Sequence, residues 1–234
     1  MKTTIFKTVI LLFVLTIILS CSKDDDISKV EESTKLLDRV NLNGNFVKYS
    51  YNEDSTIQKL EALNFNLIFG YSESRISSIE EGENLWQFQY DVNGKIRSFS
   101  IADETIDVVY DADNRFYFYE VENRVYTISL YENNEIKKYS IFDTETEEIF
   151  YNDYYYDTTK KGGLFNSNSI TIHLQMAFTN GFFFSLFNSR IPIENFATNF
   201  AGQTYSFENT FDEDGFIKKS IVSNGSYIDF FYIQ

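Results

Sequence analysis

The stretch that decides the fold is Tyr90–Ile96, which reads Tyr-Asp-Val-Asn-Gly-Lys-Ile. In such a phrase the aromatic residue ends one strand, and the Asp accepts hydrogen bonds from the backbone of a turn. The Gly takes a positive φ at little cost, and the apolar residue opens the returning strand. Related phrases occur at 51–57, 71–76, 110–116, 131–136 and 211–217. The first five copies recur about every 20 residues, enough for two strands and two turns, so the repeat predicts successive β-hairpins.

Alternating side chains support the same interpretation. Trp86, Phe88 and Tyr90 fall on one face of a strand, and the glutamines between them fall on the other. Near the start, strands expected at 36–42 and 46–51 flank an Asn-Gly pair, which favours a tight hairpin turn. Because 18% of the residues are aromatic and one is proline, the composition suits pleated sheet. We predict an all-β fold, an antiparallel meander of about ten to twelve strands in one domain.

The repeated phrases resemble the YD repeats of Rhs-type shell proteins. They resemble more closely the small YD-like β-lipoproteins of Bacteroidetes, whose domains have no known function. The resemblance covers roughly 36–151 and 205–234, and two copies carry the glycine at its expected place, Gly94 and Gly215. It implies a sheet built of successive hairpins. Because Rhs shells need far longer chains to enclose a cargo, we expect a twisted open sheet or partial barrel.

The repeat breaks near 157–204. Within this segment we expect a strand at Ile170–Phe178, where apolar residues alternate with Thr, His and Gln. Ser189–Gly202 contains the proline and no clear alternation, and reads as a loop with at most a short helix. Irregular segments on a regular scaffold often carry function. The alternative, which we favour, is a plug that covers an open face or edge of the sheet.

Residues 1–20 read as a lipoprotein signal peptide. Lys2 and Lys7 precede an apolar run, Val9–Leu19, which is too short to span a bilayer comfortably. A small residue then precedes Cys21, the single cysteine of the chain. We expect cleavage before Cys21, acylation of its thiol and of the new amine, and a fold without disulfides. The alternative is an ordinary secretory signal with an incidental cysteine.

An acidic tag follows the cysteine and consists of Ser22, Lys23, Asp24, Asp25 and Asp26. It resembles the lipoprotein export signal of Bacteroidetes, which implies an outer-membrane lipoprotein displayed on the cell surface. The alternative is a plain solvated charge run. We expect an acidic tether at 21–34 and a single β domain at 35–234.

The net charge of the chain limits the kinds of molecule that it can bind. The formal net charge is −15, and loss of the two signal-peptide lysines brings it to −17. Such a surface repels nucleic acid and anionic lipid headgroups and offers no basic groove. We therefore expect no nucleic-acid partner, and contact with the membrane through the lipid anchor.

Groups for catalysis or metal binding are scarce. The one histidine, His173, is expected on the exposed, polar side of its strand, and no second ligand makes it a zinc site. Calcium could bind the acidic turn at Asp212, Glu213 and Asp214, although hairpin turns favour the same residues without an ion. No nucleophile elbow, triad or phosphate-binding glycine loop occurs. We expect no cofactor, no metal and no enzymatic activity.

Aromatic residues remain as binding groups. Trp86, Tyr154, Tyr155, Tyr156 and Phe182–Phe184 could stack on sugar rings or on a partner protein. The alternative assigns them to the core and to cross-strand pairs, but three consecutive tyrosines must use both faces of a strand. The leading hypothesis is a non-catalytic surface lipoprotein that binds or scaffolds a polysaccharide or an envelope protein. A structural or adhesive envelope protein, and a hydrolase with two carboxylates, are the alternatives.

Overall fold

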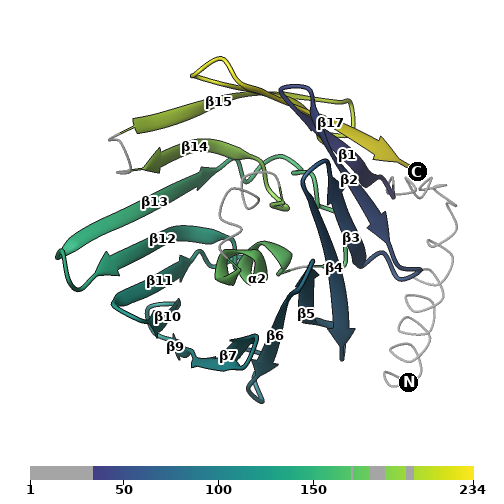
Figure 1. Cartoon of the computed structure of the whole chain (residues 1–234). Coiled ribbons are helices and arrows are strands. Elements are labelled where there is room, and N and C mark those ends of the chain that lie inside the picture. Colours follow the sequence, from purple (N-terminus) through teal and green to yellow (C-terminus); the bar gives the residue numbers. More distant parts are fainter. Residues whose placement is uncertain (1–33, 170, 180–187, 199–202) are drawn as a thin grey trace, which may run out of the picture. The chain divides into compact units, whose positions relative to one another are not determined.

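Strands make up most of the regular structure in the computed structural model of the chain (Figure 1). It describes residues 34–169, 171–179, 188–198 and 203–234, and Thr34–Gln234 form one compact unit. The all-β meander is confirmed. The expected count of about ten to twelve strands is too low, because the described residues form seventeen. The shortest strand has three residues, and one strand, β14, lies in the non-repeat segment. In chain order the elements are β1 Leu36–Leu42, β2 Asn45–Tyr51, β3 Ile57–Ala62, β4 Phe65–Ser72, β5 Arg75–Glu81, β6 Asn84–Tyr90, β7 Ile96–Ile101, β8 Glu104–Asp107, β9 Val109–Asp111, β10 Phe116–Val121, β11 Arg124–Leu130, β12 Ile136–Asp143, β13 Glu148–Tyr156, α2 Ile172–Phe178, β14 Ile193–Thr198, β15 Gln203–Phe211, β16 Ile217–Val222 and β17 Tyr227–Ile233.

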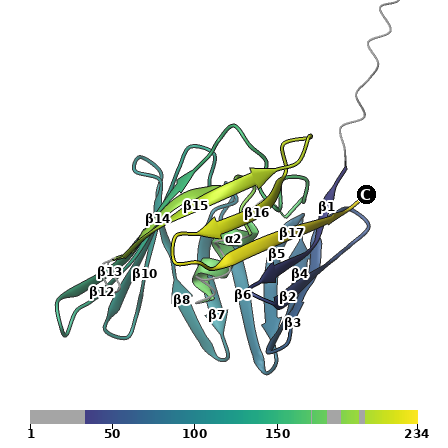
Figure 2. The same cartoon turned by 90° about the horizontal axis from the view of Figure 1, so that it is seen from above.

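The sheet curls until its two ends meet (Figures 1 and 2). Each strand pairs antiparallel with its neighbours in the chain, and β1 pairs with both β2 and β17. On the other side, β8 and β9 are consecutive pieces of one stretch, separated by Val108, and pair with β7 and β10 respectively. The result is a nearly closed barrel, which agrees with the expected partial barrel. Closure leaves little strand edge to pair with another chain.

The turns follow the chemistry of the repeat. The Oδ1 atom of Asp91 accepts hydrogen bonds from the backbone N–H groups of Asn93 and Lys95, both at 2.8 Å. The bond from Lys95, helped by that from Asn93, holds the pKa of the Asp91 carboxyl below its ordinary value. Gly94 has φ +76°, the left-handed conformation that the phrase predicts.

The aromatic residue of the repeat has a second role. Its hydroxyl can donate to a carbonyl oxygen at the start of the preceding strand, with which its own strand pairs. Tyr71 on β4 donates to Ile57 on β3 at 2.7 Å, and Tyr232, outside the repeated phrases, donates in the same way to Ile217 at 2.9 Å. The same bond joins Tyr51 to Leu37, Tyr90 to Ile76 and Tyr156 to Ile136. We call these five bonds the tyrosine ladder. Each bond ties together two paired strands of the barrel wall. Burial raises the pKa of Tyr71 to about 12.

The substitution Tyr71→Phe tests the tyrosine ladder. The hydroxyl of Tyr71 donates to Ile57 and also meets Ser169 Oγ at 2.7 Å. Its removal should lower the free energy of unfolding by about 1–2 kcal/mol, because it leaves partly buried acceptors without a donor. Urea unfolding measures the loss. Tyr155→Phe is the control, since that side chain is half exposed, and equal losses in the two variants would contradict the role of the ladder.

Residues 172–178 form the helix α2, so the strand expected at Ile170–Phe178 is wrong. The helix lies inside the curled sheet (Figure 1) and all seven of its residues are buried. A strand at this place would have no sheet neighbour to accept its backbone hydrogen bonds, whereas a helix satisfies most of them internally. His173 is therefore buried, with 3% of its surface exposed, and not on a polar outer face as expected.

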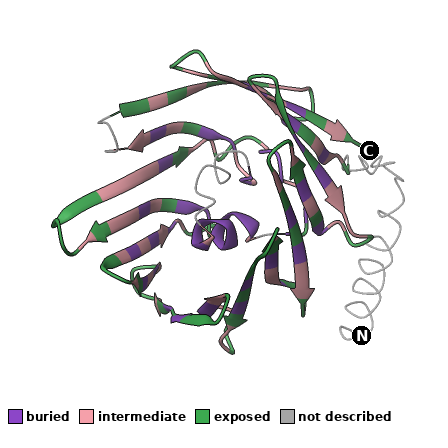
Figure 3. Ribbon diagram, viewed as in Figure 1, coloured by how far each residue is buried: buried purple, intermediate pink, exposed green. Residues whose placement is uncertain are grey.

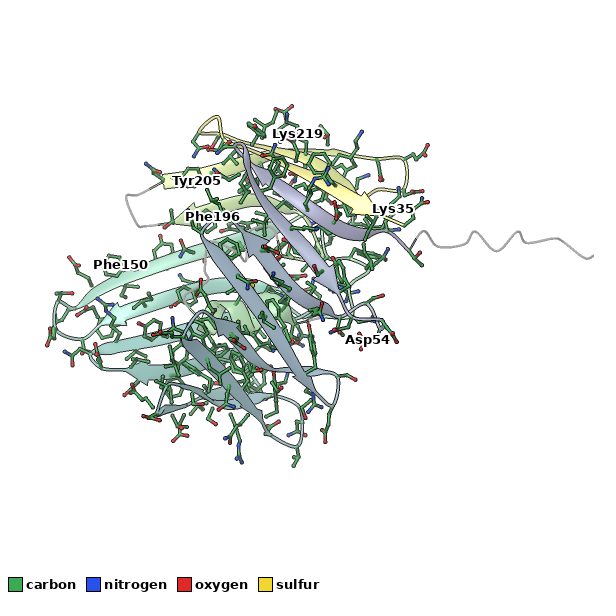
Figure 4. All side chains as sticks on the ribbon, turned by 45° about the vertical axis from the view of Figure 1, so that its right-hand side comes forward. Lys35, Asp54, Phe150, Phe196, Tyr205 and Lys219 are labelled. Atoms are coloured by element: carbon green, nitrogen blue, oxygen red, sulfur yellow. The ribbon has the colours of Figure 1, made fainter. Side chains whose placement is uncertain are left out.

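Residues 193–198 form β14, so the loop expected over Ser189–Gly202 is also wrong for this part. The strand pairs with β13 and β15 and fills the place between them in the ring. Phe196 of β14 lies opposite Tyr205 of β15, and their rings stack with centroids 6.1 Å apart (Figure 4). Such pairs stabilise sheets without strict alternation in one strand. Pro192 stands just before the strand, where it removes no ladder hydrogen bond.

Candidate functional site

Residues 157–169, 171–179 and 188–192 occupy one end and the interior of the barrel, and we call them the plug. The backbone N–H of Ile57 donates to Ser169 Oγ at 2.7 Å, and Asn168 N–H donates to Ser55 O at 3.1 Å. Lys161 exchanges backbone hydrogen bonds with Gly215 and Ile217. These bonds attach the plug to repeat turns from distant parts of the chain.

Aromatic side chains fill the space around α2. Phe178 meets the rings of Phe88, Phe99, Tyr117 and Tyr119, with centroids 5.1–6.3 Å apart. A pocket where the plug meets β15–β17 has no charged side chain in its lining. In the described part of the interior, these rings pack directly against α2.

The core also contains buried polar side chains, and one group of them surrounds Glu135. The Oε1 atom of Glu135 accepts a hydrogen bond from Arg190 N–H at 3.1 Å, and its Oε2 lies 3.7 Å from His173 Nε2. His173 Nε2 is also 3.0 Å from the carbonyl oxygen of Asn134. Among the side chains that the structure describes, Glu135 is the one fully buried carboxylate. The group joins the turn before β12 to the plug.

Of the four aromatic residues singled out from the sequence that the structure describes, three belong to the core. Trp86 and Tyr154 are buried, and the hydroxyl of Tyr156 donates to the carbonyl of Ile136 at 2.9 Å. Tyr155 instead points outward with 49% of its surface exposed. Cys21, the tag Ser22–Asp26 and Phe182–Phe184 lie outside the described residues.

The acidic turn considered for calcium is held by a lysine. Lys35 Nζ lies 2.8 Å from Asp212 Oδ2 and also pairs with Asp214. The Oδ1 atom of Asp212 accepts hydrogen bonds from the backbone of its own turn, as hairpin turns favour. In the part of the chain that the structure describes, no group of three or more His, Cys, Asp or Glu is placed to hold a metal ion.

The outer surface of β9–β13 carries several outward aromatic and aliphatic side chains. Since Tyr117 and Tyr119 are buried, Phe116 and Phe118 point outward. The strand register then places one row of side chains across the sheet: Val109, Phe118, Thr127, Ser140 and Tyr151.

A second row lies beside it: Glu120, Val125, Phe142 and Ile149. We call these two rows, with Phe116, Ser129 and Tyr155, the aromatic face. Val109 and Ile149 are about half exposed, and Figure 3 shows green and pink segments along these strands. The sequence signal is a run such as Phe116–Tyr119, whose four consecutive aromatic residues must occupy both faces of a strand.

Elsewhere the outer surface is mostly polar, whereas the interior is apolar. Leu60 on β3 is buried and Glu61 beside it is exposed, and Phe88 on β6 is buried and Gln87 is exposed. Transmembrane barrels alternate in the opposite sense, with apolar residues toward lipid and polar residues toward the lumen. No helix within the described ranges is both long and apolar enough to cross a membrane.

Comparison with known proteins gives a likeness in fold. No family model matches the chain, and no curated protein matches it. Among solved structures, the crystal structure of a porin-like protein from Bacteroides uniformis is similar, with a TM-score of 0.50 and 12% sequence identity. The match covers 84% of this chain and 96% of that one. At this identity the likeness supports the curled antiparallel β fold alone.

Proposed function

We propose that this protein is a lipid-anchored, non-catalytic envelope protein whose barrel stays in water and binds a ligand through the aromatic face. The observation that carries the proposal is the direction of the side chains. Apolar residues fill the barrel and charged or polar residues cover most of its outside, the reverse of a barrel that conducts solutes through lipid. The anchor is the lipid chains on Cys21, which attach the barrel to a membrane without inserting it.

An outer-membrane location on the cell surface is part of the proposal. The tag after Cys21 resembles an export signal, and the barrel is similar in fold to a porin-like protein from a Bacteroides. The absence of enzymatic activity is also proposed. Support comes from the packed interior and from Glu135, a buried carboxylate without a second one beside it among the described residues.

The substitution Cys21→Ala tests the anchor. Expressed as the full precursor in a Bacteroides host, the variant should lose labelling by radioactive palmitate completely, because Cys21 carries the thiol that is acylated. Ser22→Ala is the matched control and should keep the label. In the same cells, protease added from outside should digest the labelled wild-type protein. Labelling of the Cys21→Ala chain would contradict the anchor, and protection of the wild type would contradict surface display.

A structural or adhesive envelope protein is the second function that an observation favours. All of α2 is buried, and ring contacts of Phe178 tie it to β6, β7 and β10 of the wall. Deletion of the gene would then weaken the envelope or attachment, and substitutions on the aromatic face would leave both unchanged.

A further inference from the structure

We propose that the aromatic face binds an uncharged polysaccharide. This inference rests on the proposed function, in which the face meets a ligand outside the cell. Its first support is the order of side chains across the strands. In the row that ends at Tyr151, the aromatic Phe118 is followed by the hydroxyl groups of Thr127 and Ser140. Sugar rings offer apolar C–H faces that stack on aromatic rings, and hydroxyls that bond to side-chain hydroxyls.

The second support is the charge of the face. At its rim Lys138 Nζ lies 3.8 Å from Asp153 Oδ1 and 4.2 Å from the centre of the Tyr151 ring, so these two charges largely cancel. Glu120 is the one charged residue in the two rows, and Asp111, opposite Phe116, bonds to the backbone of its own turn. The face is thus close to neutral on a chain of net charge −15. An anionic polymer would be repelled by the rest of the surface, and a cationic one would find few carboxylates here.

The third support is the size of the face. Five strands about 4.8 Å apart, each with two or three outward residues about 7 Å apart, cover roughly 300 Å². A stable protein–protein interface needs about 800 Å² on each partner. A second copy of the chain would in addition bring the same negative charge against the first. A short stretch of glycan chain fits the available area, so we commit to a polysaccharide ligand.

Affinity electrophoresis tests the proposal with the full processed protein. The gels contain dextran, laminarin, mannan or, as the anionic counterpart, alginate. The wild type should be retarded by at least one neutral polymer and not by alginate. The double substitution Phe118→Ala with Phe142→Ala should weaken binding about tenfold, since each ring contributes stacking. The control, Ile68→Ala with Leu85→Ala, removes two exposed aliphatic side chains on β4 and β6, outside the face, and should stay within about twofold.

A second pair of substitutions serves if the first pair impairs folding. Thr127→Val with Ser140→Ala keeps the shape of the face and removes two hydroxyls, and binding should again fall about tenfold. Circular dichroism confirms the fold of each variant.

Four results have defined meanings. Retardation by a neutral polymer that the face variants lose supports the proposal. Retardation by alginate alone would contradict an uncharged polysaccharide as the ligand. The same conclusion follows if no neutral polymer retards the protein and an envelope protein is captured through Phe118 and Phe142. Both of these results leave the proposed function standing. If a folded, lipidated wild type binds no polymer and captures no partner, both proposals fail.

Discussion

Phe178→Ala is expected to lower the free energy of unfolding by about 3–5 kcal/mol, the range for removing a buried aromatic ring. Phe178 has 3% of its surface exposed and lies at the end of α2. Its ring is the common neighbour of four others, on β6, β7 and β10, at centroid distances of 5.1–6.3 Å. The barrel wall is held by backbone pairing and cannot collapse into the vacated space, so the cost should lie toward the upper end.

Urea unfolding followed by tryptophan fluorescence measures this loss, because Trp86 is buried in the same core. Leu63→Ala is the control, since Leu63 stands in a turn with 91% of its surface exposed and should change stability by less than about 0.5 kcal/mol. If Phe178→Ala and Leu63→Ala unfold at the same urea concentration, α2 does not stabilise the barrel. The plug would then be an appendage of the sheet.

The repeat was readable from the sequence because its interactions are local. Asp91 bonds to the backbone two and four residues ahead, and the hairpin of β1 and β2 closes through an Asn-Gly pair. Such contacts depend on residues adjacent in the chain, so the phrase alone specifies them. The alternation of Trp86, Phe88 and Tyr90 likewise placed them on one side of β6, and the structure buries Trp86 and Phe88 on that side.

The segment near 157–204 was misread because its structure depends on distant residues. Ile172–Phe178 satisfies the alternation of a strand, but the space inside a barrel admits a helix, which satisfies most of its own hydrogen bonds. Ile193–Thr198 shows weak alternation and becomes a strand because β13 and β15 lie on either side of it. Neither neighbour is visible from the local sequence, so non-local pairing decided both segments.

The aromatic face was only partly foreseeable. The consecutive tyrosines that end in Tyr156 required an outward aromatic, and Tyr155 is that residue. The two rows around Phe118 depend on the register of five strands, which the sequence did not supply. Trp86 and Tyr154 were plausible ligand contacts until the curl of the sheet placed them in the core.

The second large loss of stability is expected when the buried side chain of Glu135 is removed. Glu135 stands in a repeat turn, and its side chain points into the core toward the plug and not toward water. Its carboxylate accepts the backbone N–H of Arg190 at 3.1 Å and lies 3.7 Å from His173 Nε2. Its side chain thereby connects the wall of the barrel to two segments of the plug, α2 and residues 188–192.

Glu135→Ala should lower the free energy of unfolding by about 3 kcal/mol, because it leaves the Arg190 N–H in the core without its acceptor and opens a space beside the buried His173 ring. Glu135→Gln keeps an acceptor for Arg190 N–H and should cost less than half as much. Glu132→Ala, in the same turn but with an exposed side chain, is the control and should be nearly neutral. Urea unfolding ranks the three variants.

If Glu135→Gln is as damaging as Glu135→Ala, the negative charge beside His173 holds the plug. If Glu135→Ala matches Glu132→Ala, the group contributes nothing to stability, and the aromatic contacts of α2 alone fix the plug in the barrel.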